Sequence, residues 1–504
     1  MQAADPESPS LRLLVNGEPV TVSGVSPQAT LLEFLREHRA LCGTKEGCAE
    51  GDCGACTVVL AESDGARVAW KPVNACIRLL PSVAGKGVFT VEALQAPDGT
   101  LHPAQQALVD HHGSQCGFCT PGFTMSLFGL FKNARRPSTQ AIEDALSGNL
   151  CRCTGYRPIV AAAQAMHDAR PLPDWRACGV ADDGSRAMSP DEEQLAASLA
   201  SLGEQGTVSY ESHGRRWWSP RTEDALAQLL VEHPDARIVA GATDVGLWVT
   251  KHHRDLGHVV YTGDVDELRA VRETPTHLCI GAAASLTEAF AALDVSWPEL
   301  HEAWARFASV PIRNSGTLGG NVANASPIGD SMPALMALGA TVVLRRGDVT
   351  RELDLADLYL AYQKTALQPG EFVKEIRVPA RRDDLLLRAY KISKRYDQDI
   401  SAVFACFALV VEHGRIVQAR IGCGGVAAVP KRATATEAVL VGQPWNETTA
   451  DAAVRELSRE FSPIDDMRAS AAYRRAVLGN LMRRFHLETT ASRVRTRIEQ
   501  ITPT

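Results

Sequence analysis

Three cysteines lie close together near the start of the sequence, in the stretch GCAEGDCGAC. Cys48, Cys53 and Cys56 follow the spacing C-x4-C-x2-C, and Cys76 is the next cysteine along the chain. Three such thiols with a distant fourth form the plant-type pattern of a [2Fe–2S] cluster. A structural zinc site usually has two C-x2-C pairs, which this triple does not match. The sequence predicts one [2Fe–2S] cluster on these four residues, and Cys42, outside the spacing, is not expected to be a ligand.

A second set of cysteines comes in two pairs, Cys116-x2-Cys119 and Cys151-x-Cys153. Taken alone, this pattern is open between an iron–sulfur cluster and a zinc site. Its position directly after the plant-type set favours a second [2Fe–2S] cluster, because two neighbouring clusters can pass single electrons along a relay. Two unrelated metals at these positions would have no such shared purpose.

The length, net charge and cysteine content of the chain limit the class of protein. The chain has 504 residues, enough for about three to five domains, and its net charge of −7 offers no general attraction to nucleic acid or to anionic membranes. The opening MQAADPESPS lacks the features of a signal peptide, and no apolar run approaches the ~18 residues of a membrane span. A cytoplasmic location is therefore expected, where clustered cysteines are metal ligands rather than disulfides. The four scattered cysteines are expected to be inert: Cys178, Cys279, Cys406 and Cys423.

Short elements must position the first set. Leu11–Val22 predicts two strands joined by a tight turn at Asn16-Gly17, and Thr30–His38 has the spacing of a helix. The loop Gly43–Cys56 follows, and a strand resumes after it. These elements predict a small sheet with one packed helix.

The second set is expected in a helical unit. Helices are predicted over HPAQQALVDHH, over Thr120–Asn133, and in the segment that Ser138 caps and Gly148 ends. The segment 168–206 is rich in Pro, Gly, Asp and Ser, with one helical run from Asp191 to Leu202. It predicts a connection between domains that runs over the surface.

The second half contains two glycine-rich stretches, RIVAGATDVGLW (Arg237–Trp248) and PIRNSGTLGGNVANASPIGD (Pro311–Asp330). Successive amides in such turns can bind phosphate oxygens, although ordinary loops have the same composition. The chain has no G-x-G-x-x-G after a strand and no G-x4-G-K-[ST], so a Rossmann or P-loop nucleotide site is not supported.

These motifs resemble one family. GTKEGCAEGDCGACTV, NAC, QCGFCTPG and NLCRCTGY are similar to the two-cluster module of the xanthine dehydrogenase family of molybdenum hydroxylases, with all eight ligand positions in order. Gln115 matches a position close to the molybdopterin of a partner. The glycine-rich stretches and YKISKRYDQDIS (Tyr390–Ser401) resemble the flavin-binding segments of the family, although Asp244 replaces the commoner Glu and Gln398 interrupts an acidic run. The resemblance covers 10–165 and 207–490.

The resemblance implies a set of FAD-binding residues. They are Val239, Ala240, Gly241, Ala242, Thr243, Asp244, Val245, Phe307, Thr317, Leu318, Gly319, Gly320, Asn321, Asp330, Val373 and Lys391.

The resemblance also implies the fold class, a multidomain α+β protein. The expected parts are a tail (1–9), a β-grasp plant-type ferredoxin domain (10–90), a four-helix [2Fe–2S] domain (91–167), the linker (168–206), a non-Rossmann α+β FAD-binding domain of two subdomains (207–383), an α+β flavoprotein C-terminal domain (384–490) and a second tail (491–504).

The order of the parts, clusters first and FAD second, resembles the small subunit of the bacterial members of this family, and nothing resembles the molybdenum-binding portion. The resemblance implies that a molybdopterin partner oxidises hypoxanthine and xanthine to urate, and that electrons pass through the clusters to FAD and then NAD+. A dimerised αβ pair is expected, and purine hydroxylation would have no catalytic residue in this chain. Two alternatives remain: the equivalent subunit for an aldehyde or N-heterocycle, and a non-enzymatic protein stabilised by zinc.

Overall fold

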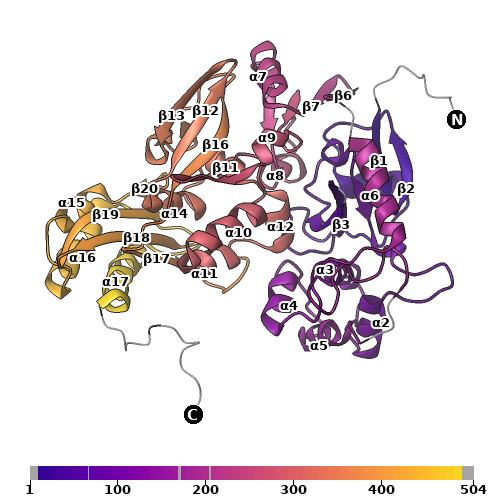
Figure 1. The fold of residues 1–504 in the computed structure, drawn as a ribbon, viewed down its shortest axis with the longest axis horizontal. Coiled ribbons are helices and arrows are strands. Elements are labelled where there is room, and N and C mark those ends of the chain that lie inside the picture. Colours follow the sequence, from indigo (N-terminus) through magenta and orange to yellow (C-terminus); the bar gives the residue numbers. More distant parts are fainter. Residues whose placement is uncertain (1–9, 66, 169–171, 204–205, 491–495, 497–504) are drawn as a thin grey trace. The chain divides into compact units, whose positions relative to one another are not determined.

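The structure is a computed structural model that describes residues 10–65, 67–168, 172–203, 206–490 and 496 (Figure 1). The predicted tails, 1–9 and 491–504, lie outside the described residues apart from residue 496. By its internal contacts the chain divides into two units. The first comprises Met1–Asp266 with Ala308–Gly316, and the second comprises Glu267–Phe307 with Thr317–Thr504.

The first unit begins with a five-stranded sheet in the order β2-β1-β5-β3-β4. Its strands are β1 (Leu11–Val15), β2 (Glu18–Val22), β3 (Thr57–Asp64), β4 (Arg67–Asn74) and β5 (Gly87–Phe89). Asn16 (φ 55°) and Gly17 (φ 90°) close the predicted hairpin, because a two-residue turn of this kind needs positive φ at both positions. The predicted helix begins at a Thr30 capping box as α1 (Leu31–Glu33) and continues as a π-helical turn, Phe34–His38. The expected sheet with one packed helix is confirmed.

Four helices follow, as predicted. They are α2 (Pro103–Asp110), α3 (Thr120–Asn133), α4 (Thr139–Leu146) and α5 (Arg157–Ala165). α3 has the predicted bounds, and the Ser138 side chain caps α4 by accepting a hydrogen bond from the amide of Ala141. Their buried faces share one core, which includes Cys151.

The described part of the predicted linker differs from a surface connection. Its helix, α6 (Pro190–Gly203), packs against β3 and β4 and buries Leu195, Ala196 and Leu199. Glu192 of α6 is 3% exposed and forms an ion pair with Lys132 of α3 at 2.8 Å. The sequence missed this attachment because the partners of α6 lie far away along the chain.

A second, four-stranded sheet completes the first unit, in the order β6-β7-β9-β8. Its elements are β6 (Val208–Ser212), β7 (Arg215–Ser219), α7 (Glu223–Glu232), β8 (Arg237–Val239), α8 (Val245–Thr250) and β9 (Val259–Tyr261). α12 (Val310–Ser315) also belongs here, because it packs against β4 and Asn314 donates a hydrogen bond to the Pro72 carbonyl at 2.9 Å. The predicted FAD-binding domain therefore contributes residues to both units.

The second unit contains a five-stranded sheet in the order β10-β11-β16-β12-β13, with a large apolar core. The strands are β10 (Val271–Glu273), β11 (His277–Gly281), β12 (Thr341–Arg346), β13 (Val349–Asp354) and β16 (Phe372–Pro379), beside the short pair β14 (Tyr359–Ala361) and β15 (Lys364–Thr365). Its helices include α10 (Leu286–Ser296), α11 (His301–Ala305), α13 (Leu318–Asn324) and α14 (Ser331–Leu338), and α9 (Asp266–Arg269) lies at the border of the units.

The chain continues into a four-stranded sheet in the order β17-β18-β19-β20. Its elements are β17 (Leu385–Ile392), β18 (Val403–Glu412), β19 (Arg415–Gly424), β20 (Lys431–Arg432), α15 (Thr434–Leu440), α16 (Glu447–Glu460) and α17 (Ala471–Thr490). No helix in the described residues is both long and apolar enough to cross a membrane. The whole is a mixed α+β architecture, as predicted.

Candidate functional site

The first cysteine set lies in the loop before β3, with Cys76 just after β4. Cys56 and Cys76 are buried, whereas Cys48 and Cys53 are half-buried. Hydrogen bonds from the thiols of Cys53 and Cys76 lower the pKa of Cys48, and a hydrogen bond from the Cys76 thiol lowers the pKa of Cys56. The fold thus brings all four predicted ligands of the first cluster into contact, and Cys42 is exposed outside this group.

The second set converges in two pairs. Hydrogen bonds from the amide of Phe118 and from the Cys153 thiol lower the pKa of Cys116. Burial raises the pKa of Cys119 to about 12, and its hydrogen bond to Cys151 adds to this shift. Cys116 therefore pairs with Cys153, and Cys119 pairs with Cys151.

Pairwise contacts of this kind fit a binuclear cluster, in which each iron takes two thiolates. Among the residues that the structure describes, no group of three or more His, Cys, Asp or Glu side chains is arranged to hold a single metal ion. A structural zinc site needs four ligands around one ion. The pairwise contacts of the cysteines are therefore the observation that fits [2Fe–2S] clusters.

Backbone amides point at two of the sulfurs. The amides of Asp52 and Cys53 each donate to Cys48 Sγ at 3.4 Å, and the amide of Thr154 donates to Cys151 Sγ at 3.4 Å. Hydrogen bonds to ligand sulfurs stabilise the thiolate and tune the reduction potential of a cluster. Both loops thus supply what a bound cluster requires besides its ligands.

The two cysteine sets are neighbours in the fold. The Cys53 carbonyl accepts a hydrogen bond from the amide of Leu150, the residue before Cys151, at 3.0 Å. A Cβ added at Gly54 would lie 2.2 Å from the Gly148 carbonyl oxygen, so the backbones of the two loops touch. This approach requires glycine, because φ at Gly54 is also positive, at 71°.

The opposite side of the first loop contacts α8. The Thr250 hydroxyl donates to the Ala49 carbonyl at 2.7 Å, and the Lys251 ammonium donates to the Cys48 carbonyl. A Cβ added at Gly246 would lie 2.5 Å from the Ile77 carbonyl oxygen. The first cysteine loop therefore lies between α8 and the second cysteine set.

Two residues beside the second set escaped the sequence analysis. Tyr156 is the central residue of a γ-turn with positive φ (68°), which the hydrogen bond from the Arg157 amide to the Gly155 carbonyl closes at 2.8 Å. Its phenol oxygen accepts from the Cys151 amide at 3.0 Å, and the Thr154 hydroxyl lies 3.1 Å from Cys151 Sγ. A positive φ at a residue other than glycine is strained, and such strain persists where surrounding contacts hold the residue in place. Both residues lie in NLCRCTGY, the stretch that contains Cys151 and Cys153, and this is the sequence signal that could have pointed to them.

The predicted FAD residues fall into two groups, one in each unit. Val239–Val245 form the turn from β8 into α8, with Ala242 at φ 58° and Asp244 at the start of the helix. A Cβ added at Gly241 would lie 1.9 Å from the Ser315 carbonyl oxygen, so glycine is required by the packing of this turn on α12.

The second group lies around α13 and α14. Thr317 caps α13 through the Gly320 amide, and the Asn321 side chain accepts from the Ser331 hydroxyl at 2.5 Å. Leu318 and Val373 are buried, Phe307 packs edge-on against Phe290 at 5.2 Å, and Gly319 lies close to Ala282.

Asp330 and Lys391 form a buried ion pair within this group. Lys391 Nζ donates to Asp330 Oδ2 at 2.7 Å, and the Ser401 hydroxyl donates to the same oxygen at 2.9 Å. Asp330 is 2% exposed, and its Oδ1 has no hydrogen-bond partner. A buried carboxylate oxygen normally accepts a hydrogen bond, and a flavin ring N–H or a ribityl hydroxyl would donate one to Asp330 Oδ1. The residues therefore fit FAD, and Ser401 is a contributor that the sequence analysis missed.

The scattered cysteines differ from these sets. Burial raises the pKa of Cys406 and of Cys423, and Cys279 is buried too. Cys178 is half-buried and donates to the Phe131 carbonyl at 3.1 Å. Thiols kept protonated by burial are poor nucleophiles and metal ligands, as expected for inert cysteines.

Four family models match the chain in sequence. They are described as the 2Fe-2S iron-sulfur cluster binding domain (residues 13–79), the [2Fe-2S] binding domain (90–164), the FAD binding domain in molybdopterin dehydrogenase (209–381) and the CO dehydrogenase flavoprotein C-terminal domain (388–489).

Curated relatives include xanthine dehydrogenases. The chain is 34% identical to that of Drosophila pseudoobscura pseudoobscura over 526 residues, which covers 95% of this chain and 39% of the relative. It is 31% identical to the xanthine dehydrogenase/oxidase of Gallus gallus, over 91% of this chain and 38% of the relative. The chain thus spans about two fifths of the length of these relatives.

Solved structures of CO dehydrogenases are similar to part of the chain. A Cu,Mo-CO dehydrogenase chain is 30% identical with a TM-score of 0.50, and the match covers 53% of this chain and 94% of that one. A chain of CO dehydrogenase from Oligotropha carboxidovorans is 28% identical with a TM-score of 0.51, and the match covers 54% of this chain and 96% of that one.

Proposed function

The chain belongs to the molybdenum hydroxylase family, as its iron–sulfur and FAD-binding electron-transfer part, and from this premise we propose that it serves a xanthine dehydrogenase. In this proposal a molybdopterin-binding partner oxidises hypoxanthine and xanthine to urate, and this chain delivers the electrons to NAD+. The observation that carries the proposal is the convergence of two cysteine quartets in a chain of which 95% matches a xanthine dehydrogenase.

The proposed ligands follow the observed pairs. Cys48, Cys53, Cys56 and Cys76 hold one cluster, and Cys116, Cys119, Cys151 and Cys153 hold the other. When bound, the clusters carry single electrons and FAD collects two of them for transfer as a hydride, so the cofactors supply the redox chemistry. The chain itself positions the ligands, donates hydrogen bonds to their sulfurs and excludes water from Cys56 and Cys76.

The contacts support an order for the relay. The first cysteine loop touches α8, which begins at the last of the proposed FAD residues Val239–Val245, and its other side touches the second set. We therefore place the first cluster next to FAD and the second cluster on the side of the molybdopterin partner.

The surroundings of the second set support a partner there. Cys116 and Cys153 are exposed, and the side chains nearby include Phe118, Leu150 and Tyr156, which are 47%, 42% and 40% exposed. Exposed apolar side chains in a group are typical of protein interfaces. With Gln115 near the molybdopterin, the proposed assembly is an αβ pair that dimerises to a heterotetramer in the cytoplasm.

A second candidate is the equivalent part of another molybdenum hydroxylase, acting on an aldehyde or an N-heterocycle. The likeness to CO dehydrogenase chains favours keeping it, because one of them matches 53% of this chain at 30% identity, which is close to the 34% identity of a xanthine dehydrogenase. The substrate pocket is proposed to lie on the partner in either case.

Metal and sulfide analysis of the full chain tests the cluster proposal. We expect four irons and four acid-labile sulfides per chain, and half of each after Cys53→Ser or after Cys116→Ser. Cys42→Ser is the matched control, since this exposed thiol lies outside both sets, and it should leave the iron content unchanged. Zinc without sulfide would overturn the proposal in favour of a zinc-stabilised protein.

An assay of the co-purified complex tests the substrate and the acceptor. We expect xanthine-dependent reduction of NAD+ by the complex, and reduction of a dye by NADH but no purine oxidation by this chain alone. Turnover of an aldehyde or N-heterocycle without turnover of xanthine would favour the second candidate.

A further inference from the structure

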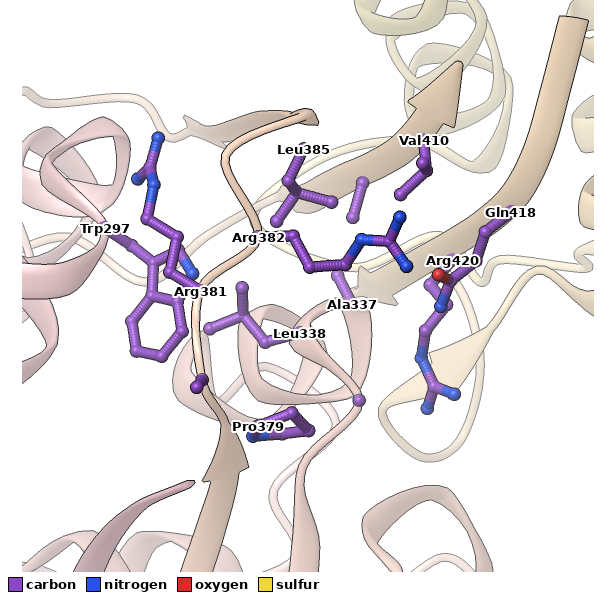
Figure 2. Close-up of a pocket in the computed structure, with 13 residues that line it drawn as sticks. Trp297, Ala337, Leu338, Pro379, Arg381, Arg382, Leu385, Val410, Gln418 and Arg420 are labelled. Carbon is purple, nitrogen blue, oxygen red and sulfur yellow. The ribbon is translucent and has the colours of Figure 1, made fainter. Parts of the chain in front are cut away.

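The arginines around one cavity of the second unit show how cations can be balanced in this chain (Figure 2). The cavity, of about 200 Å³, lies between α14 and strands β17, β18 and β19. Each of its three arginines binds at least one carboxylate within 3.6 Å: Arg381 binds Glu299, Arg382 binds Asp384 and Glu412, and Arg420 binds Asp354. Carboxylates therefore offset these charges locally, and the cavity has no excess of positive charge.

Lys251 of the first unit is bound differently. Its ammonium donates a hydrogen bond to the carbonyl of Cys48, a neutral group on a proposed ligand of the first cluster. Glu50 is its ion-pair partner, but Lys251 Nζ and Glu50 Oε2 are 3.8 Å apart, which is too long for a hydrogen bond. The hydrogen bond therefore holds the positive end of this pair at the ligand loop.

Helix α8 fixes the position of Lys251. The helix begins in the proposed FAD turn and ends at Thr250, whose hydroxyl donates to the Ala49 carbonyl of the ligand loop at 2.7 Å. A Cβ added at Gly246 would lie 2.5 Å from the Ile77 carbonyl oxygen, so the helix backbone also touches the residue that follows the fourth ligand. A packed element thus holds Lys251 against the loop.

The ligand loop itself is acidic. Between residues 43 and 56 it has one lysine and three carboxylates: Lys45, Glu46, Glu50 and Asp52. In the proposed relay, the first cluster is reduced by one electron from the second cluster and is reoxidised when that electron passes to FAD. Each reduction adds one negative charge near these carboxylates, which oppose it. A fixed cation nearby stabilises the reduced form and raises the reduction potential.

We propose that Lys251 sets the reduction potential of the first cluster, because its ammonium stabilises the negative charge that an arriving electron adds. The inference rests on the proposed cluster at Cys48, Cys53, Cys56 and Cys76. Lys251 acts through its charge and through the Cys48 carbonyl, as a positioning residue rather than a catalytic one.

A potentiometric titration of the full chain with its clusters, followed by electron paramagnetic resonance, tests the proposal. Lys251→Met keeps the length of the side chain and removes its charge. We expect the midpoint of the signal that Cys53→Ser abolishes to fall. At a fixed potential the ratio of reduced to oxidised cluster should drop about three- to tenfold, which is about 30–60 mV for a one-electron couple. The signal that Cys116→Ser abolishes should keep its midpoint.

Further variants separate the charge of Lys251 from its contacts. Lys251→Arg keeps the charge and should restore the midpoint, whereas Glu50→Gln removes a negative charge and should raise it. Arg67→Gln is the matched control, because it removes a positive charge at the other end of β4, roughly 23 Å from Asn74, and should leave the midpoint unchanged. Since the Lys251 side chain is 38% exposed, the shift should shrink at about 1 M salt, where the screening length is ~3 Å.

The outcomes distinguish this inference from the proposed function. An unchanged midpoint in Lys251→Met with full iron content would overturn the inference alone. Shifts of the same sign in Lys251→Met and Glu50→Gln would also overturn it, because they would come from distortion of the loop. The absence of any [2Fe–2S] signal in the unchanged chain would overturn the proposed function, and this inference with it. If Lys251→Met loses its iron, the direction of the shift in Glu50→Gln decides the result.

Discussion

The buried ion pair between Lys132 and Glu192 attaches α6 to the helical [2Fe–2S] region. Lys132 Nζ donates to Glu192 Oε2 at 2.8 Å and to the carbonyls of Trp175 and Ala177 at 2.9 and 2.8 Å. The other carboxylate oxygen accepts from the Trp70 indole at 2.7 Å. The Lys132 side chain is 0% exposed and that of Glu192 is 4% exposed, so water does not solvate either charge and each is stabilised by the other.

Glu192→Ala should therefore be strongly destabilising. It leaves the Lys132 ammonium without a counter-charge and the Trp70 indole without an acceptor. Loss of one partner of a buried pair costs about 3–5 kcal/mol. At roughly 2–4 °C per kcal/mol for a domain of this size, the melting temperature should fall by about 6–20 °C. The double variant Lys132→Met/Glu192→Leu should lose less than Glu192→Ala, because apolar replacement of a buried pair is often neutral.

Thermal unfolding of the full chain, followed by circular dichroism, measures these changes. The control is Glu211→Gln, because the Arg216–Glu211 pair is 43% and 47% exposed and should contribute about 1 kcal/mol or less. A Glu192→Ala variant no less stable than this control would refute the reasoning. So would a double variant that is less stable than Glu192→Ala, since the penalty would then not come from an unpaired buried charge.

Three further predictions concern single residues. Burial lowers the pKa of His102 to about 3, below the ~6.5 of the unfolded chain, so the stability that neutral His102 contributes is complete above pH 6.5 and is lost as the pH falls towards 3. Between pH 7 and pH 5 the urea midpoint should therefore drop by the equivalent of about 2 kcal/mol, and the drop should be smaller in His102→Asn. Tyr156→Phe removes the acceptor of the Cys151 amide and should cost about 1–2 kcal/mol and shift the electron paramagnetic resonance signal of one cluster, and an unchanged spectrum would contradict a role at that site. Gly54→Ala would place a Cβ 2.2 Å from a carbonyl oxygen and should reduce the iron content, whereas Gly65→Ala, also at positive φ (64°) but in open space, should not.

Local chemistry explains which elements the sequence predicted well. The Asn16-Gly17 turn, the Thr30 capping box and the Ser138 cap each depend on residues within a few positions of one another. The same holds for the cysteine spacings, because a loop that supplies three ligands is short. The predicted hairpin and helices therefore agree with the fold, and the fold brings the cysteines of each predicted ligand set together.

The surface linker was the main difference between expectation and structure. Its composition is polar, but α6 buries an apolar stripe and Glu192. The group that makes this burial favourable, the Lys132 ammonium, is sixty residues away in the sequence. A pattern within the segment could not predict that neutralising partner.

The sequence by itself predicted which cysteines would hold the clusters, because their spacing reports on local loop geometry, and its resemblance to the family gave the expected FAD-binding residues. The tertiary structure decided how they are arranged: Cys116 pairs with Cys153, the first cysteine loop lies between α8 and the second set, and α12 packs with the first unit. These relations depend on close contacts between distant segments, such as the approach of Gly54 to Gly148. Contacts of this kind follow from the packing of the whole core, and no single stretch of the sequence contains them.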